Sequence, residues 1–247
     1  MSTPAIYRAT ISCIIHHFPD REELLRHLDI GSGSGELVRL VEEHYDNVRP
    51  VCCDYTNELM QLPDRQVDII DLNAVAVLPY DDARFDAVTA TEVIEHLEDF
   101  RKLLREMRRV LRPGGLLVLS TPNILNLNSR LRNLWFGFAE LMGPLPVNAR
   151  KKESCAGHIS PVSPFYIMHA LRETGFRNVD MTVDRYQRSG MLKLAFLWIP
   201  FLIMNTFITR REVRKYKTID ASNRDMVRQI NSLPLLLGRT VVLSAVK

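Results

Sequence analysis

The stretch LDIGSGSGEL, Leu28 to Leu37, decides the fold of this chain. It places Gly31, Gly33 and Gly35 at alternate positions, directly after a short apolar run and directly before residues with helical spacing. A strand, a glycine turn and a helix N-terminus together expose backbone N–H groups and leave room for a ligand to come close. A glycine triplet alone is equally compatible with a plain turn between a strand and a helix. The rest of the chain has to separate the two interpretations.

The composition is ordinary for a soluble globular protein. The chain has 247 residues, 46% of them hydrophobic and 25% charged, with a formal net charge of +3. This length fits one large α/β domain, and we expect a single domain over residues 1–247. The charge balance indicates no nucleic-acid partner. The four cysteines, Cys13, Cys52, Cys53 and Cys155, lack metal-ligand spacing, and no secretory signal is read near the start, so we expect reduced thiols in a cytoplasmic protein.

Strand-like and helix-like stretches alternate along the chain. Strands are predicted at residues 24–30, 48–55, 85–91, 116–121, 177–184 and 239–247. Helices are predicted up to Phe18, over 35–45, from Phe100 to Leu111 with an end at Pro113-Gly114-Gly115, and over 163–176 with Ser163 as N-cap and Gly175 as C-cap. Such alternation is typical of a mostly parallel sheet with helices on both faces.

Carboxylates follow successive predicted strands. Asp29 and Asp54 end the first two strands, and Asp71 follows a further apolar run. The carboxyl ends of parallel strands meet at one edge of the sheet, where open α/β sheets bind ligands. Asp54 comes about 19 residues after Gly35, close to the spacing of a ribose-binding acid. We therefore expect the ligand to contain a nucleoside.

The glycine spacing disfavours dinucleotides and nucleoside triphosphates. The pattern is G-x-G-x-G, and Glu36 stands where the dinucleotide fingerprint has its third glycine. A pyrophosphate there would meet an extra carboxylate. No Gly-Lys-Ser/Thr follows, so the loop is not a P-loop. An NAD-dependent enzyme is kept as a rival interpretation.

With these motifs together, the chain resembles the class I S-adenosylmethionine-dependent methyltransferases. The resemblance covers about Leu28 to Asn123 and rests on LDIGSGSGEL, VCCDYTNEL, DLNAVAVLPYDDARFDAVTATEVIEHLEDF and LREMRRVLRPGGLLVLSTPN. The chain is most similar to the branch of ubiquinone-pathway O-methyltransferases and bacterial enzymes that modify small molecules and polysaccharides. The resemblance implies a Rossmann-like, doubly wound, mostly parallel seven-stranded sheet of order 3-2-1-4-5-7-6, whose antiparallel last strand residues 239–247 fit.

The resemblance also implies which residues hold the cofactor, S-adenosylmethionine. Gly31, Gly33 and Gly35 would contact its methionine part, Asp54 its ribose hydroxyls, Asp71 and Leu72 its adenine, and Glu92 and Val93 would face the region of its methyl group. Asp29, Ser32 and Tyr55 complete the expected cofactor-binding set.

Methyl transfer from a sulfonium is an in-line displacement that depends mainly on alignment, and an oxygen nucleophile also needs a proton acceptor. His96, in EVIEHLED, and His158, in AGHISPVSP, are the candidate catalytic residues. The alternatives are a structural hydrogen bond for His96 and a solvated loop position for His158. No metal is predicted, because the lysine- and acid-rich site of catechol-type methyltransferases is not recognised, although some ubiquinone-type relatives need a metal.

A long apolar stretch lies in an insertion at about residues 186–237, before the last strand. Nearly every residue from Met191 to Ile208 is apolar, and Arg210, Arg211, Arg214, Lys215 and Lys217 follow. The length approaches that of a membrane span, yet the strands on either side must pair in one sheet. A pocket lid, a homodimer contact and a peripheral membrane contact through residues 191–217 remain open. The apolar stretch Asn133–Pro146 is a candidate for the same surface.

The sequence therefore predicts a methyltransferase that O-methylates a small-molecule or lipid-linked acceptor, in the cytoplasm or on the inner face of the membrane. The alternative is a catalytically silent S-adenosylmethionine-binding partner subunit. The acceptor itself is not assigned.

Overall fold

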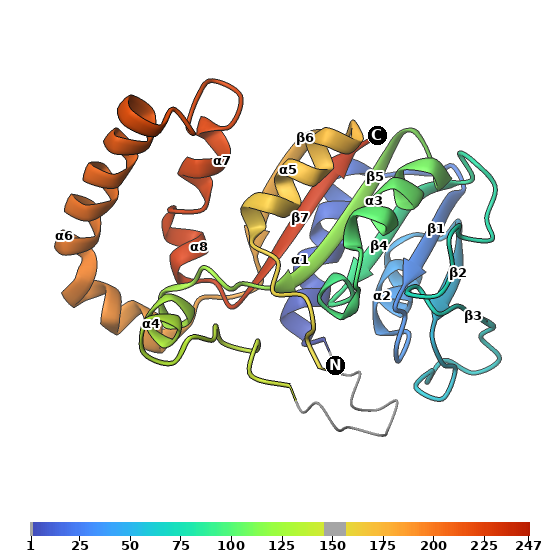
Figure 1. Ribbon diagram of the computed structural model, residues 1–247. Coiled ribbons are helices and arrows are strands. Elements are labelled where there is room, and N and C mark those ends of the chain that lie inside the picture. Colours follow the sequence, from blue (N-terminus) through green and yellow to red (C-terminus); the bar gives the residue numbers. More distant parts are fainter. Residues whose placement is uncertain (1, 146–156) are drawn as a thin grey trace.

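The computed structural model describes residues 2–145 and 157–247, so Cys155 and Pro146 lie outside the described residues (Figure 1). One seven-stranded sheet has the order β3-β2-β1-β4-β5-β7-β6. Its strands are β1 (Leu25–Ile30), β2 (Val48–Asp54), β3 (Val67–Ile69), β4 (Phe85–Thr91), β5 (Leu111–Pro122), β6 (Arg177–Val183) and β7 (Thr240–Val246). Only β7 runs antiparallel to its neighbours, β5 and β6, and this confirms the predicted order and direction.

Helices cover both faces of the sheet. They are α1 (Pro4–His17), α2 (Glu36–His44), α3 (Phe100–Val110), α4 (Leu127–Phe136), α5 (Pro164–Thr174), α6 (Arg188–Arg211), α7 (Arg224–Gln229) and α8 (Leu233–Leu237). The 3-10 turn η1 (Ile94–His96) follows β4, and the π-helical turn η3 (Glu212–Tyr216) follows α6. Apolar side chains of α1 and α2 pack on one face, and those of α3 and α5 on the other. All seven residues of β4 are buried, as expected for a strand between two helical layers.

The ends of two helices show how far local signals determined the structure. Ser163 caps α5 by accepting a hydrogen bond from the Phe165 amide, and Gly175 ends this helix at a φ of +96°, both as predicted. The predicted end of α3 is wrong, because the helix stops at Val110 and Pro113-Gly114-Gly115 belongs to β5. A Cβ on Gly115 would lie 3.0 Å from the Asp86 carbonyl oxygen. The Pro-Gly-Gly segment therefore packs closely against the neighbouring strand β4, where the register of the two strands shifts, and it is not a helix stop.

The edge strand β3 has three residues, two of them exposed, and is too short to show a strand pattern in the sequence. Its role is to join the end of β2, because the amide of Ile70 donates to the carbonyl oxygen of Asp54 at 2.8 Å. This bond brings the segment that contains Asp71 to the sheet edge where β2 ends.

The residues of the predicted insertion form α6, η3, α7 and α8 between β6 and β7. A bridge between Tyr186 and Gly238 closes the insertion at its base. Figure 1 shows α6 at the margin of the molecule, with α7 and α8 between it and the sheet. Among the described cysteines, Cys52 and Cys53 are buried thiols and Cys13 is half-buried.

Candidate cofactor and acceptor site

The glycine loop lies between β1 and α2, and its three glycines have different reasons to be glycine. All three adopt positive φ: 72° at Gly31, 52° at Gly33 and 80° at Gly35. A Cβ on Gly31 would lie 2.4 Å from Cγ2 of Val93, and one on Gly35 would lie 2.8 Å from the Met60 sulfur. A Cβ on Gly33 would meet nothing closer than 4.0 Å. The protein itself therefore fills the space beside Gly31 and Gly35, whereas the space beside Gly33 is open to a ligand.

Asp54, at the end of β2, holds this loop in place. Its Oδ2 accepts from the amide of Gly33 at 2.8 Å, and its Oδ1 accepts from the amide of Tyr55 at 2.7 Å. Each carboxylate oxygen keeps a further lone pair. The predicted ribose-binding acid is therefore oriented next to the open glycine.

Ser32 has a structural role inside the loop. Its hydroxyl donates to the carbonyl oxygen of Asp29 at 2.7 Å and accepts from the amide of Cys53 at 3.1 Å. The residue is buried, so its side chain ties β1 to β2 and any ligand contact falls to its backbone. Tyr55 has the opposite character, because most of its side chain is exposed beyond Asp54.

A buried polar chain lies behind the loop. The Thr89 hydroxyl donates to Oδ1 of Asp29 at 2.7 Å and accepts from Nε2 of His27 at 2.7 Å. Burial raises the pKa of Asp29 to about 7, helped by the nearby charge of Asp54, and burial lowers the pKa of His27 to about 4. Nδ1 of His27 has no hydrogen-bond partner among the described residues, which agrees with a neutral ring protonated on Nε2.

Asp71 and Leu72 follow β3 at the same edge. The Asp71 side chain is exposed and accepts from the amide of Asn73 at 3.0 Å, and Leu72 is half-buried against the core. Asn73 in turn donates to the carbonyl oxygen of His96 at 3.2 Å. The structure therefore links the predicted adenine-binding pair to the loop after β4, although the two are far apart in the chain.

Glu92, the residue after β4, has a strained backbone and a buried carboxyl. Its φ is +56°, a conformation that costs energy for a residue with a side chain, and its amide is held by the carbonyl oxygen of Ser120 at 3.1 Å. Burial raises its pKa to about 7, against the opposing charge of Arg239. Its Oε1 is buried without a hydrogen-bond partner in the described part of the chain. Strain together with an unpartnered acceptor is typical of a functional position.

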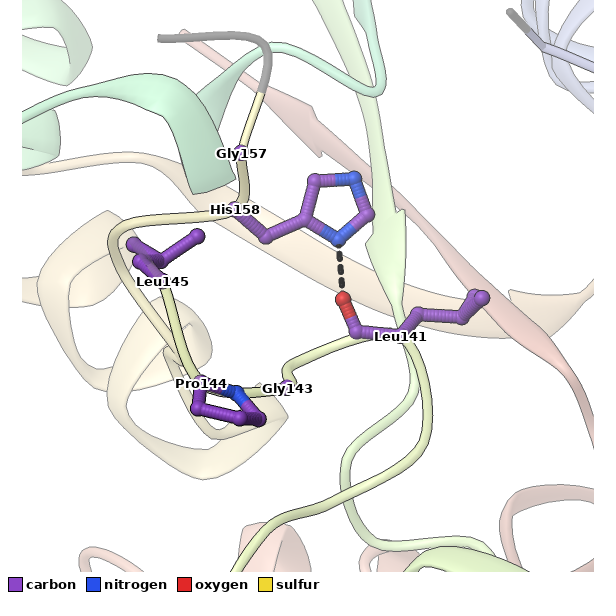
Figure 2. A pocket seen from close by; sticks show the side chains of 6 residues that line it. All are labelled: Leu141, Gly143, Pro144, Leu145, Gly157 and His158. Atoms are coloured by element: carbon purple, nitrogen blue, oxygen red, sulfur yellow. Dashed lines mark hydrogen bonds between the residues drawn. The ribbon is translucent and has the colours of Figure 1, made fainter. Parts of the chain in front are cut away.

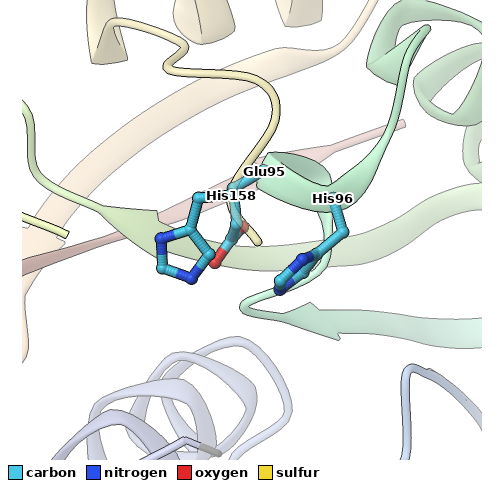
Figure 3. Close-up of side chains that lie close together, drawn as sticks. All are labelled: Glu95, His96 and His158. Atoms are coloured by element: carbon cyan, nitrogen blue, oxygen red, sulfur yellow. The ribbon is translucent and has the colours of Figure 1, made fainter. Parts of the chain in front are cut away.

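Glu95, His96 and His158 form a cluster (Figure 3). Their ligand-type atoms all lie within 4.8 Å of one another. Oε2 of Glu95 accepts from the Thr121 hydroxyl at 3.1 Å, whereas its Oε1 is buried without a described partner. Burial, followed by the charge of Glu92, raises the pKa of Glu95 well above its ordinary value. The sequence prediction had not singled out Glu95.

Hydrogen bonds to carbonyl groups orient the two imidazoles. Nδ1 of His96 lies 3.2 Å from the carbonyl oxygen of Gly157, and Nδ1 of His158 lies 2.6 Å from that of Leu141. Because a carbonyl oxygen only accepts, Nδ1 carries the proton in both rings when they are neutral. Nε2 of His158 is then a base, or a metal ligand, with a fixed orientation.

A shallow hollow of about 230 Å³ adjoins His158 (Figure 2). It is lined by Leu141, Gly143, Pro144, Leu145, Gly157 and His158. These residues come from the segment after α4 and from the segment before α5. An acceptor bound here would therefore contact the segment that continues from the apolar surface of α4.

Comparisons with known proteins agree with this geometry. A family model described as a methyltransferase domain matches residues 7–181. Demethylmenaquinone methyltransferase of Thermus thermophilus is 33% identical over 101 residues, 38% of this chain and 46% of that protein. Its counterpart in Deinococcus radiodurans is 32% identical over 118 residues, 45% of this chain and 47% of that protein. The matches thus span about half the length of these curated relatives.

Solved structures share the fold at low identity. A SAM-dependent methyltransferase from Archaeoglobus fulgidus superposes with a TM-score of 0.60 at 19% identity, covering 100% of this chain and 95% of that one. Phosphoethanolamine N-methyltransferase 2 of Haemonchus contortus, in complex with S-adenosyl-L-methionine, gives a TM-score of 0.53 at 15% identity, covering 97% of this chain and 52% of that one. Because the family model covers well over half of the sequence and the sheet has the expected strand order, the chain belongs to the methyltransferase-domain family, with the fold of the class I S-adenosylmethionine-dependent methyltransferases.

Proposed function

We propose that this protein transfers the methyl group of S-adenosylmethionine to an oxygen atom of a small-molecule acceptor. Family membership supports the reaction class. The cluster of Glu95, His96 and His158 supports the finer proposal, because two oriented imidazoles lie beside a buried carboxyl, after the strand end that precedes Glu92, one of the residues expected to bind the cofactor.

The residues present fit the cofactor. The space beside Gly33 is open, the Asp54 carboxylate has acceptor capacity left for a pair of hydroxyls, and Glu92 holds a buried acceptor without a described partner. We assign to these residues, with Gly31, Gly35 and the Asp71-Leu72 pair, the binding of S-adenosylmethionine. When bound, the cofactor supplies a methyl group already activated on a sulfonium.

The chain then has to align an acceptor oxygen and remove its proton. Nε2 of His158 is the proton acceptor in this proposal, because its Nδ1 is occupied by a carbonyl group, and the His96 ring lies against it. Positioned general bases of this kind typically contribute on the order of 100- to 10,000-fold to rate. Alignment of the reacting atoms supplies the larger share, roughly 7–11 kcal/mol.

A metal-assisted version of the same reaction is the second candidate. One carboxylate oxygen and two imidazole nitrogens within 4.8 Å of one another suit a divalent transition metal, and Oε1 of Glu95 has no described partner to satisfy it. Such a cation would supply Lewis-acid activation of a hydroxyl. This candidate runs against the sequence prediction of no metal, which did not include Glu95.

One experiment distinguishes the histidine-base mechanism from the metal-assisted mechanism. Methyl transfer from labelled S-adenosylmethionine to a panel of phenolic and aliphatic alcohols is measured before and after treatment with EDTA, with Mg²⁺, Mn²⁺ and Zn²⁺ added back. Activity that survives EDTA supports the histidine base, and activity restored by one cation supports the metal. Binding of S-adenosylhomocysteine without turnover on any acceptor would favour the silent partner subunit instead.

A lipid-linked acceptor and a cytoplasmic location on the membrane face are finer proposals. They are supported by the exposed apolar residues of α4 and α6 and by the segment after α4, which lines the hollow beside His158. A homodimer through the same surface is the competing arrangement.

A further inference from the structure

The outward side of α6 is an exposed apolar stripe. Its residues are Leu192, Phe196, Ile199, Ile203 and Phe207, which are 59 to 84% exposed. Spacings of three and four place them on one face of the helix. We call these five residues the outer face of α6. An exposed apolar stripe of this length on a folded protein normally contacts another surface.

The opposite side of α6 is already used for packing. Leu194, Leu197, Trp198 and Phe201 pack with α4 and α8 around Leu127, Leu236 and Leu237. The helix is therefore apolar on both sides, and in α6 only Gly190 and Leu194 are buried. A helix that is apolar all round requires cover on every side, and the body of the protein provides it on one side only.

α6 with η3, Arg188 to Tyr216, is long and apolar enough to span a membrane by length and composition, and an 18-residue window within it has a mean hydropathy of 1.8. The ends of the insertion exclude a crossing. The amide of Gln187 donates to the carbonyl oxygen of Leu237 at 2.8 Å, next to the paired strands β6 and β7. Beyond η3 the chain returns to the core, where Met226 of α7 is buried. Both ends thus stay on the same side of any bilayer, and α6 can only lie along its surface.

The charge of this segment indicates which kind of surface covers the outer face of α6. Between Arg188 and Lys217 there are seven basic residues and a single acidic one, Glu212. Five of the basic residues follow the apolar stripe directly: two at the end of α6, two in η3 and Lys217 just after η3. A second copy packed along α6 would bring the same positive surplus to the contact. An anionic lipid surface complements the charge and covers the stripe at once.

α4 extends this surface at the foot of α6 (Figure 1). Trp135 is 82% exposed, and Leu134 and Phe136 beside it are also exposed. The Arg130 guanidinium of α4 lies over the Phe201 ring of α6, 5.6 Å from its centroid, so the two helices are in contact there. Exposed tryptophan is enriched where proteins meet the headgroup region of a bilayer.

We propose that the outer face of α6, with the exposed end of α4, docks on an anionic membrane surface, with the basic residues of α6 and η3 against the lipid headgroups. Docking itself does not depend on the proposed function. It deepens that function in one respect, because the segment after α4 lines the hollow beside His158 and the docked protein would receive a lipid-borne acceptor from the bilayer side.

The test is flotation of the full-length protein with vesicles, without cofactor or acceptor, so that failure of methyl transfer cannot affect the result. We expect flotation with phosphatidylcholine vesicles that contain about a third phosphatidylglycerol, and little with phosphatidylcholine alone. Replacing Arg210, Arg214 and Lys217 with Gln should weaken partitioning roughly 100-fold, at about 1 kcal/mol per basic residue. The matched control replaces the exposed Arg8, Arg49 and Arg105 with Gln and should leave it unchanged.

A second pair of variants tests the apolar contact. Phe196→Asp with Ile203→Asp should abolish flotation, whereas Val77→Asp with Tyr166→Asp, at comparably exposed positions, should not. Thermal unfolding checks that each variant is folded. In a Trp198→Phe variant the fluorescence of Trp135 should shift to the blue when anionic vesicles are added.

Three results would overturn the proposal. One is equal flotation with neutral and anionic vesicles. Another is flotation that resists both sets of substitutions. The third is a homodimer, seen by sedimentation equilibrium without vesicles, that dissociates in the Phe196→Asp and Ile203→Asp variant, because the outer face would then be covered by a second copy.

Discussion

The imidazole rings of His96 and His158 lie edge to face, with their centroids 5.0 Å apart. His96 ends the 3-10 turn after β4, and His158 precedes α5 on a separate segment. Both rings donate from Nδ1 to backbone carbonyl groups, so the orientation of each ring is fixed. This relationship turns two separate histidine hypotheses into one site with Glu95.

The first prediction concerns this site. His96→Gln and His158→Gln should each lower kcat by about 100-fold or more if the ring is the proton acceptor, because the amide cannot take up a proton. Cofactor affinity should change little in the variant that has lost the base. The measurement is single-turnover methyl transfer together with calorimetry of S-adenosylhomocysteine binding. His44→Gln, at an exposed position on α2, is the control. Unchanged rates in both variants would remove the histidines from the mechanism.

The second prediction separates two glycines of the loop. Gly31→Ala should destabilise the protein by about 1–3 kcal/mol, since its Cβ would lie 2.4 Å from Val93 and the backbone has positive φ. Gly31→Ala with Val93→Ala should recover part of this loss. Gly33→Ala should destabilise the protein only by the strain of placing alanine at positive φ. It should weaken cofactor binding, because its Cβ enters the open space. Denaturant unfolding and calorimetry measure both. If Gly33→Ala bound S-adenosylhomocysteine normally, the cofactor would not approach the loop there.

The third prediction concerns Asp54. Asp54→Asn removes a charged acceptor from the edge of the loop and should weaken binding of S-adenosylhomocysteine by roughly 1.5–3 kcal/mol. The melting temperature should fall less than the affinity suggests, because the remaining carbonyl oxygen still accepts one of the two loop amides. Asp46→Asn, at an exposed position before β2, is the matched control. Equal affinities in the two variants would mean that Asp54 holds the loop and does not touch the ligand.

The fourth prediction concerns the pH dependence of stability. The pKa of His27 is lowered to about 4. The contribution of His27 to the free energy of unfolding is therefore complete above the unfolded pKa of about 6.5 and is lost as pH falls towards 4. The pKa of Asp29 is raised to about 7. The contribution of Asp29 to the free energy of unfolding is therefore complete below the unfolded pKa of about 3.9 and is lost as pH rises towards 7. The two effects oppose each other over the same range, and together they should largely cancel.

Single substitutions should expose each effect. Asp29→Asn leaves the His27 effect, and the free energy of unfolding should rise between pH 4 and 6.5, by up to about 3 kcal/mol. His27→Gln leaves the Asp29 effect, and stability should fall as pH rises over the same window. Urea unfolding at several pH values gives both slopes relative to the unsubstituted protein. If the free energy of unfolding changed with pH in the same direction in both variants, Asp29 and His27 would not titrate independently.

The sequence alone determined most strands and helices of a mostly parallel sheet, because alternating apolar runs, helix caps and the glycine loop are local signals that tertiary packing did not override. The order of the strands was predicted from the resemblance to the class I methyltransferases, and the structure confirms it. The sequence also placed Asp29, Asp54 and Asp71 at one edge, since parallel strands end together. It misplaced the end of α3, where Gly115 is required by the close approach of the neighbouring strand β4 and not by the helix. It missed β3, which is too short to carry a pattern.

Other features were decided only by the tertiary structure. Glu95 becomes part of a site because a 3-10 turn sets its buried carboxyl beside His158, which the chain reaches only after β5 and α4. The apolar run at 191–208 could have become core, but α8 and α4 cover only one side of α6 and leave the other exposed. Local sequence specifies which surfaces are apolar and which side chains can react, whereas contacts between distant segments decide which of them are buried and which of them meet.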